Sequence, residues 1–123
     1  MTKFFRFLVA TTIAIFAIGS LTACSSEINV DMSSVAAVVD VRTPQEYSEG
    51  HLDGALNIDF QGPNFSSEIS TLDSSANYVI YCRSGNRAGK AIEFMKNNGF
   101  TGILTNAGAA TDASALTGMA IVK

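Results

Sequence analysis

The sequence predicts an α/β fold in which a small parallel sheet is flanked by helices on both faces. Short runs of β-branched and aromatic residues, at 35–41 and 78–81, are typical of strands buried on both sides. Helical patterns follow these runs, and strands that alternate with helices indicate a parallel sheet. A chain of 123 residues can form one such core and is too short for two domains.

The first predicted strand, residues 35–41, leads directly into a short helix. Thr43 takes the N-cap position, Pro44 the first helical position and Glu46 the third position after the cap, which is the pattern of a capping box. Gly50 ends this helix. The capping box therefore accounts for Glu46 without a catalytic role.

Weaker patterns fill the middle of the chain. We expect a brief strand at 55–58, a short helix at 65–72 and a strand at 78–81 that runs straight into Cys82. The clearest helix begins at Arg87 and ends near Gly99. Its apolar residues recur at the spacing of one helix face: Ala88, Ala91, Ile92 and Met95.

The C-terminal region carries the least informative pattern. A strand is expected at 102–105 and a helical turn at 112–116. The Gly-, Ala- and Thr-rich residues 106–118 fit a surface loop of small residues at least as well as a functional segment. No role is assigned to them.

The first 24 residues have the pattern of an export signal. Lys3 and Arg6 precede an apolar run at 7–18, which is shorter than the roughly 20 residues that a membrane-spanning helix needs. Residues 21–24, Leu-Thr-Ala-Cys, resemble the lipobox of bacterial lipoproteins, in which the cysteine becomes the lipidated N-terminus. An uncleaved anchor and an ordinary cleavage site that precedes a cysteine are the alternatives.

With this interpretation, the chain consists of a lipoprotein signal peptide at 1–23, a tether at 24–34 and a domain at 35–123. Lipidation of Cys24 would anchor the domain to a membrane, since two or more acyl chains give stable attachment. We therefore expect a lipid-anchored protein of the bacterial cell envelope that faces the periplasm.

Charge and cysteine content exclude several classes of function. Lys3 and Arg6 are two of the eight basic residues, so the chain from Cys24 onward has six basic against eleven acidic residues. This acidic balance argues against a nucleic-acid partner. Two cysteines are too few for a disulfide framework, and no His/Cys cluster has the spacing of a zinc site. We expect neither a metal nor a cofactor.

The candidate nucleophile is Cys82, at the end of a predicted strand and the start of a loop that opens into a helix. Open α/β sheets place their sites at this end. Loop N–H groups, the helix dipole and two guanidinium groups, those of Arg83 and Arg87, would favour the thiolate. No separate base is then needed, and His51, the only histidine, fits a structural role better. The alternative for Cys82 is a buried, inert residue.

Two blocks of the sequence resemble the rhodanese family. The first comprises Val39–Arg42, Glu46–Tyr47, Gly50–Ala55 and Asn57–Ile58, and the second is Tyr78–Arg87. They lie in the order and spacing of the family. The resemblance implies a rhodanese-like fold and a thiosulfate sulfurtransferase, in which Cys82 takes a sulfane sulfur from a small anionic donor and passes it, as a persulfide, to an external thiol or to cyanide.

The resemblance also implies roles for the residues around Cys82. Arg83 and Arg87 would position the donor, and the amide groups from Ser84 through Gly85 and Asn86 to Ala88 would stabilise charge on the sulfur. For the arginines, solvated surface charge is the alternative. Structural support is expected from an ion pair between Asp40 and Arg42 and from the residues already discussed, Glu46 and His51.

The chain departs from the family after its last core strand, where a glycine pair and a tryptophan are common. It has Asn106-Ala107-Gly108 there and no tryptophan. Two rival functions stay open. A phosphatase or arsenate reductase needs one more residue between the cysteine and the arginine than the four found here, and a non-catalytic binding module could use the same fold at the cell envelope.

Overall fold

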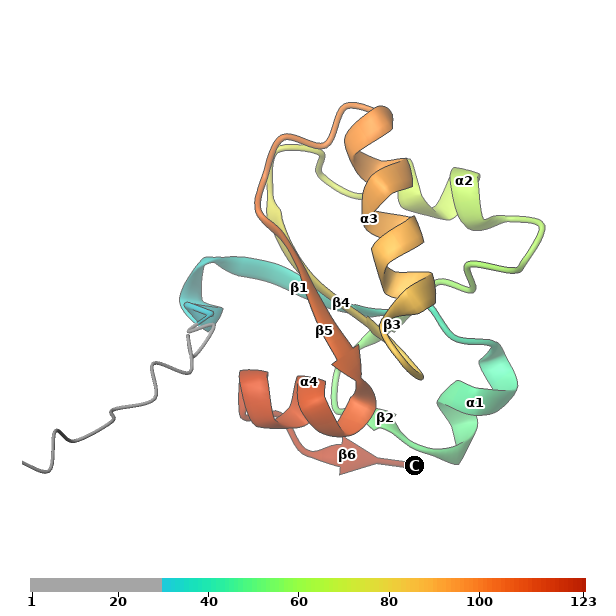
Figure 1. The fold of residues 1–123 in the computed structure, drawn as a ribbon, viewed down its shortest axis with the longest axis vertical. Coiled ribbons are helices and arrows are strands. Elements are labelled where there is room, and N and C mark those ends of the chain that lie inside the picture. The colour runs from blue at the N-terminus through green and yellow to red at the C-terminus, as the bar shows by residue number, and fades with distance from the viewer. Residues whose placement is uncertain (1–29) are drawn as a thin grey trace, which may run out of the picture.

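A computed structural model describes residues 30–123. The predicted signal peptide, Cys24 and the first part of the tether lie outside the described residues. Four parallel strands form the central sheet, in the spatial order β3-β1-β4-β5 (Figure 1). They are β1 (Val35–Asp40), β3 (Leu56–Asn57), β4 (Asn77–Cys82) and β5 (Leu104–Ala109).

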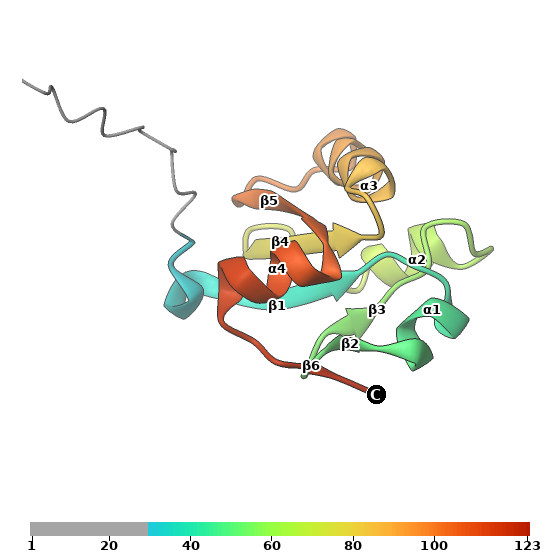
Figure 2. The ribbon, with the colours of Figure 1, turned by 60° about the horizontal axis from the view of Figure 1, so that its bottom comes forward.

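Helices cover both faces of this sheet, so the predicted α/β arrangement is confirmed. One face carries α2 (Phe65–Ile69) and α3 (Asn86–Asn97), and the opposite face carries α4 (Ala110–Thr117) (Figures 1 and 2). The short helix α1 (Pro44–Glu49) follows β1, as its capping box predicts. That box is complete, because Thr43 accepts the Glu46 N–H and the Glu46 carboxylate accepts the Thr43 N–H.

Alternation along β4 divides the interior into two clusters. Tyr78, Ile80 and Cys82 contribute to the cluster beneath α2 and α3, whereas Val79 and Tyr81 contribute to the cluster beneath α4. This is the two-residue period of a strand that is buried on both faces. The nucleophile candidate therefore emerges on the same face as the helix that follows it.

A second, two-stranded sheet lies beside the first and was not predicted. It pairs β2 (His51–Leu52) with β6 (Ile121–Val122) in antiparallel register, His51 opposite Val122. Figure 2 shows it below the central sheet, next to the C-terminus. Strands of two residues carry no periodic signal, and only the folded chain brings these two segments together.

The C-terminal expectations need correction. The last strand of the central sheet begins at Leu104 and extends to Ala109, beyond the predicted 102–105, and α4 is a full helix rather than a turn at 112–116. Residues 106–118 therefore do not form a surface loop. Their small side chains let α4 approach the sheet closely, and Ala113 is completely buried there.

Other boundaries differ by a few residues. The helix predicted at 65–72 ends at Ile69, and the strand predicted at 55–58 is limited to Leu56–Asn57. Within the predicted tether, residues 32–34 form a 3₁₀ turn (η1, Met32–Ser34) capped by Asp31, and Val30 packs against the core. Among residues 30–123, no helix has the length and apolarity needed to cross a bilayer.

Candidate active site

The cysteine loop, residues 82–87, connects the end of β4 to the first turn of α3. The Cys82 side chain is completely buried, between the apolar cluster under α3 and the loop itself. The Gly85 N–H donates to Cys82 Sγ at 2.9 Å. The sulfur is therefore in contact with a backbone donor and is not surrounded by apolar groups alone.

The loop backbone makes the thiol more acidic. Burial raises the pKa of the Cys82 thiol, but the backbone N–H groups of Ala88, Ser84, Gly85 and Arg87 lower it by more. The pKa of the thiol is therefore lower than its ordinary value, as expected for a sulfur at a helix N-terminus. These N–H groups therefore favour the thiolate over the neutral thiol.

Gly85 gives the loop its shape. It lies at the N-cap of α3 with φ +91°, in the left-handed region that side chains with a Cβ rarely adopt. This conformation points its N–H back to Cys82 Sγ while its carbonyl accepts the Gly89 N–H at 2.9 Å. One residue thus joins the sulfur to the first helical turn.

The two loop arginines have different surroundings. Arg87 forms a bidentate ion pair with Glu46 of α1, at 2.8 and 2.9 Å. Arg83 is exposed and makes no ion pair with any residue in 30–123. Arg87, expected to position a donor, therefore has its charge balanced by Glu46. Glu46, expected only to cap its helix, also fixes the end of the cysteine loop.

The predicted Asp40–Arg42 ion pair forms where the chain leaves β1. Arg42 Nη2 lies 2.7 Å from Asp40 Oδ2 and 2.6 Å from the Gly50 carbonyl oxygen. Asp40 is completely buried, and its other oxygen accepts the Arg42 backbone N–H. The pair fixes the chain as it leaves β1 and ties it to the turn after α1.

His51 lies in a structural setting. Its ring stacks on that of Tyr47 with centroids 3.6 Å apart, and Nδ1 is 2.8 Å from the Tyr47 carbonyl oxygen. No hydrogen bond within the described residues joins His51 to the cysteine loop. Among these residues, no group of three or more His, Cys, Asp or Glu side chains could hold a metal ion.

Sequence reasoning missed Asn106 of β5. Its side chain donates to the Gly85 carbonyl at 2.9 Å and so reaches the cysteine loop from the neighbouring strand. A single asparagine in a stretch of small residues carries no local signal. The one available signal was the departure from the family pattern, because Asn106-Ala107-Gly108 stands where a glycine pair is usual.

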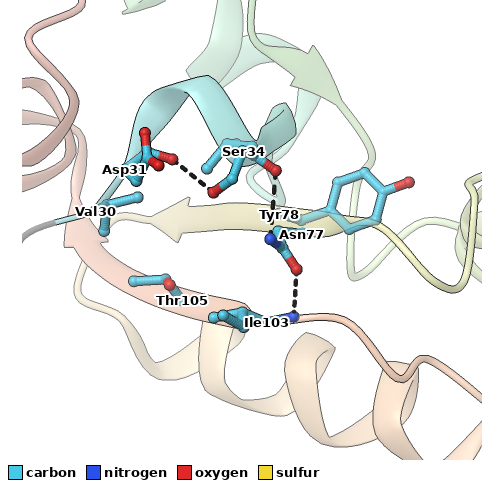
Figure 3. Close-up of a pocket in the computed structure, with 8 residues that line it drawn as sticks. Val30, Asp31, Ser34, Asn77, Tyr78, Ile103 and Thr105 are labelled. Carbon is cyan, nitrogen blue, oxygen red and sulfur yellow. Dashed lines mark hydrogen bonds between the residues drawn. The ribbon is translucent and has the colours of Figure 1, made fainter.

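The opposite end of the sheet holds a pocket of about 270 Å³ that contains none of these residues. It lies between the start of the domain, at Val30 and Asp31, and the beginnings of β4 and β5 (Figure 3). Asn77 bridges its walls, because its side chain accepts the Ile103 N–H and donates to the Ser34 carbonyl.

Comparison with known proteins agrees with this geometry. The chain is 36% identical over 75 residues to "Thiosulfate sulfurtransferase 16, chloroplastic" of Arabidopsis thaliana, spanning 53% of this chain and 62% of that protein. It is 31% identical over 74 residues to "Thiosulfate sulfurtransferase PspE" of Escherichia coli, spanning 60% and 70%. The chain thus spans about two thirds of the length of these relatives.

Solved structures share the fold. A structure described as "rhodanese with anions from E. coli" superposes with a TM-score of 0.57 at 29% identity, covering 71% of this chain and 96% of that one. The Rhodanese_3-like domain of Anabaena Alr3790 gives a TM-score of 0.61 at 20% identity, covering 71% and 98%. The rhodanese-like domain pattern itself matches residues 26–112, from before η1 into α4. With its two-faced sheet and its cysteine loop at the carboxyl end of β4, the chain belongs to the family of rhodanese-like domains.

Proposed function

We propose that the protein is a sulfurtransferase that carries sulfane sulfur on Cys82, from thiosulfate or a similar anionic donor to an external thiol or to cyanide. The hydrogen bond from the Gly85 N–H to Cys82 Sγ carries this proposal, because a backbone donor directed at sulfur favours its anionic, nucleophilic form. Relatives named as thiosulfate sulfurtransferases support it.

The reaction divides into two displacements at sulfur. The Cys82 thiolate attacks the outer sulfur of thiosulfate, an S–S bond forms to Sγ, and sulfite leaves with the electron pair of the broken bond. A thiolate or cyanide acceptor then attacks the outer sulfur of the persulfide, and Cys82 leaves as the thiolate. Both steps begin or end with charge on Sγ, which the loop N–H groups stabilise.

Charge around the loop favours a small anionic donor. Arg83 is the exposed cation next to Cys82, whereas Arg87 is paired with Glu46. In this proposal Arg83 attracts the donor and Arg87 holds the loop in shape. The overall acidic balance of the chain makes this local charge necessary.

A direct test combines mass spectrometry with turnover. After incubation with thiosulfate, the Cys82 peptide of the full chain should gain the mass of one sulfur atom, and cyanide should remove it with formation of thiocyanate. Cys82→Ser should do neither, while Cys24→Ser, the matched control, should do both. A Cys82 peptide of unchanged mass would contradict the proposal.

Complete burial of Cys82 favours a second candidate, a non-catalytic binding module of the same fold. Such a module would leave Cys82 unmodified by thiosulfate at any concentration, while the chain would remain folded. The same mass measurement therefore separates the two candidates. Persulfide formation would mean that the loop admits the donor.

We also propose that Cys24 is lipidated and that the domain faces the periplasm at a bacterial membrane. Three features of the sequence support this proposal: the basic residues Lys3 and Arg6, the apolar run at 7–18 and the lipobox-like residues 21–24. Metabolic labelling with a radioactive fatty acid should mark the full chain and fail to mark Cys24→Ser. Labelling of both would contradict lipidation at this cysteine.

A further inference from the structure

We propose that Asn106 is a positioning residue of the cysteine loop, which holds Gly85 in the conformation that stabilises the Cys82 thiolate. For its effect on turnover the inference rests on the proposed sulfur transfer. Its effect on the ionisation of Cys82 does not.

Asn106 acts on the residue that contacts the sulfur. Gly85 donates its N–H to Cys82 Sγ at 2.9 Å, and its carbonyl accepts Asn106 Nδ2 at 2.9 Å. Because Gly85 has φ +91° and no side chain, its backbone is intrinsically the most permissive part of the loop. A donor fixed on its carbonyl limits that freedom and so maintains the direction of its N–H.

An irregularity in the sheet directs Asn106 toward the loop. In the register between β4 and β5, Ile80 lies opposite Asn106 but Cys82 lies opposite Ala109, so β5 has an extra residue beside the cysteine. Bulges of this kind re-aim side chains next to active sites. Gly108, with φ +74°, forms the bend, and its N–H donates to Asn106 Oδ1 at 3.0 Å. Both ends of the Asn106 amide are therefore engaged.

Asn106 is an exposed residue, and its amide reaches the loop from the outside of the sheet edge toward Gly85 and Gly108. A Cβ added at Gly85 would lie 3.3 Å from Asn106 Oδ1 and 3.3 Å from Gly108 Cα. A Cβ added at Gly89, in the first turn of α3, would lie 3.5 Å from Asn106 Nδ2. The first approach is tight and the second is an ordinary contact, so the missing side chain of Gly85 in particular leaves room for the Asn106 amide.

The expected consequence is a change in the thiol. Without the Asn106 amide, the Gly89 N–H is the one donor within residues 30–123 that remains on the Gly85 carbonyl, and the Gly85 N–H is directed less firmly at Sγ. Asn106→Ala should therefore raise the pKa of Cys82 by about 0.5–1 unit, a shift in proportion to the weakening of one hydrogen bond to a charged group. The pH profile of the first displacement should shift upward in parallel.

The experiment follows the ¹³Cβ chemical shift of Cys82 against pH in the full chain labelled at cysteine, because this signal needs no reagent to reach the buried sulfur. Comparison with Cys24→Ser assigns the two signals. Asn106→Asp keeps the acceptor for the Gly108 N–H and removes the donor to Gly85. A rise in the pKa of Cys82 that persists at about 1 M salt, where charge effects are screened within roughly 3 Å, would reflect the lost hydrogen bond.

Asn77→Ala is the matched control. Asn77 also uses its amide for two hydrogen bonds between segments, but at the other end of β4 (Figure 3). It should lower the melting temperature and leave the pKa of Cys82 unchanged. An unchanged pKa in both Asn106 variants, or an equal rise in Asn77→Ala, would overturn the inference. If neither the wild type nor any variant transferred sulfur, the result would reject the proposed function and leave the inference about Asn106 standing.

Discussion

The two ends of the central sheet are joined by the same parallel strands but contain different chemistry. At the carboxyl end, strands lead into the cysteine loop and into α1, and two ion pairs, Asp40–Arg42 and Glu46–Arg87, lie at this end. At the amino end, the pocket of about 270 Å³ has mostly apolar walls, and neither ion pair reaches it.

The difference follows from the direction of parallel strands. At their carboxyl ends the chain continues into helix N-termini, where unpaired N–H groups and the helix dipole favour an anion. At the amino ends the chain arrives from helix C-termini and loops, which offer carbonyl groups instead. A substitution at the amino end should therefore affect stability alone, and one at the carboxyl end should affect both stability and the thiol.

The largest effect on stability is expected for Asp40→Ala. Asp40 is completely buried, and removing its carboxylate leaves the Arg42 guanidinium without its anionic partner, with the Gly50 carbonyl and the face of the Tyr81 ring as its remaining described contacts. Breaking a buried pair on one side typically costs about 3–5 kcal/mol. Urea unfolding should show this loss, and the exposed Asp73→Ala at the amino end serves as the smaller control. A loss for Asp40→Ala no greater than that for Asp73→Ala would contradict the comparison.

A smaller effect is expected for the Glu46–Arg87 pair, and it depends on pH. The hydrogen bond from Arg87 lowers the pKa of Glu46 from 4.5 to about 2. Because the folded pKa is the lower one, the carboxylate stabilises the fold above about pH 4.5, and this contribution disappears as the pH falls toward 2. For a pair this exposed we expect about 1 kcal/mol.

Unfolding by urea between pH 6 and about pH 2.5 tests this expectation, within the range where linkage predicts the loss. Glu46→Gln should be less stable than wild type at pH 6 and should lose less stability on acidification. Arg87→Met should behave in the same way, since it removes the other partner. Parallel pH profiles for wild type and Glu46→Gln would show that the ion pair contributes nothing.

At the amino end, Asn77→Ala should cost about 1 kcal/mol, the typical net value of one hydrogen bond, because its two hydrogen bonds are exposed to solvent. Its thiosulfate kinetics should match those of wild type, because none of its hydrogen bonds reaches the cysteine loop. Steady-state assays give the kinetics and thermal unfolding gives the stability. Slower transfer at unchanged stability would mean that the two ends are coupled.

The smallest effect on stability is expected for Arg83→Gln, within about 0.5 kcal/mol of wild type, because the side chain is exposed and makes no ion pair within residues 30–123. Its kinetic effect should be a higher KM for thiosulfate with little change in kcat. Added salt should raise the KM of wild type in the same direction. An unchanged KM would remove Arg83 from donor binding.

Local patterns were sufficient for the strand at 35–41, the capping box of α1, the amphipathic α3 and the position of Cys82 before a helix. These features depend on neighbouring residues, so their periodicity and cap chemistry are visible along the chain. The ion pair within β1 and the loop after it, Asp40–Arg42, is local in the same sense.

Tertiary structure alone decided the partners that lie far apart along the chain. It paired Arg87 with Glu46, brought Asn106 to Gly85 through a bulge in β5, and joined His51–Leu52 to Ile121–Val122. Each contact depends on strand order and register, which residues of different elements specify together. The periodic pattern of short strands and small residues is too weak to predict such contacts.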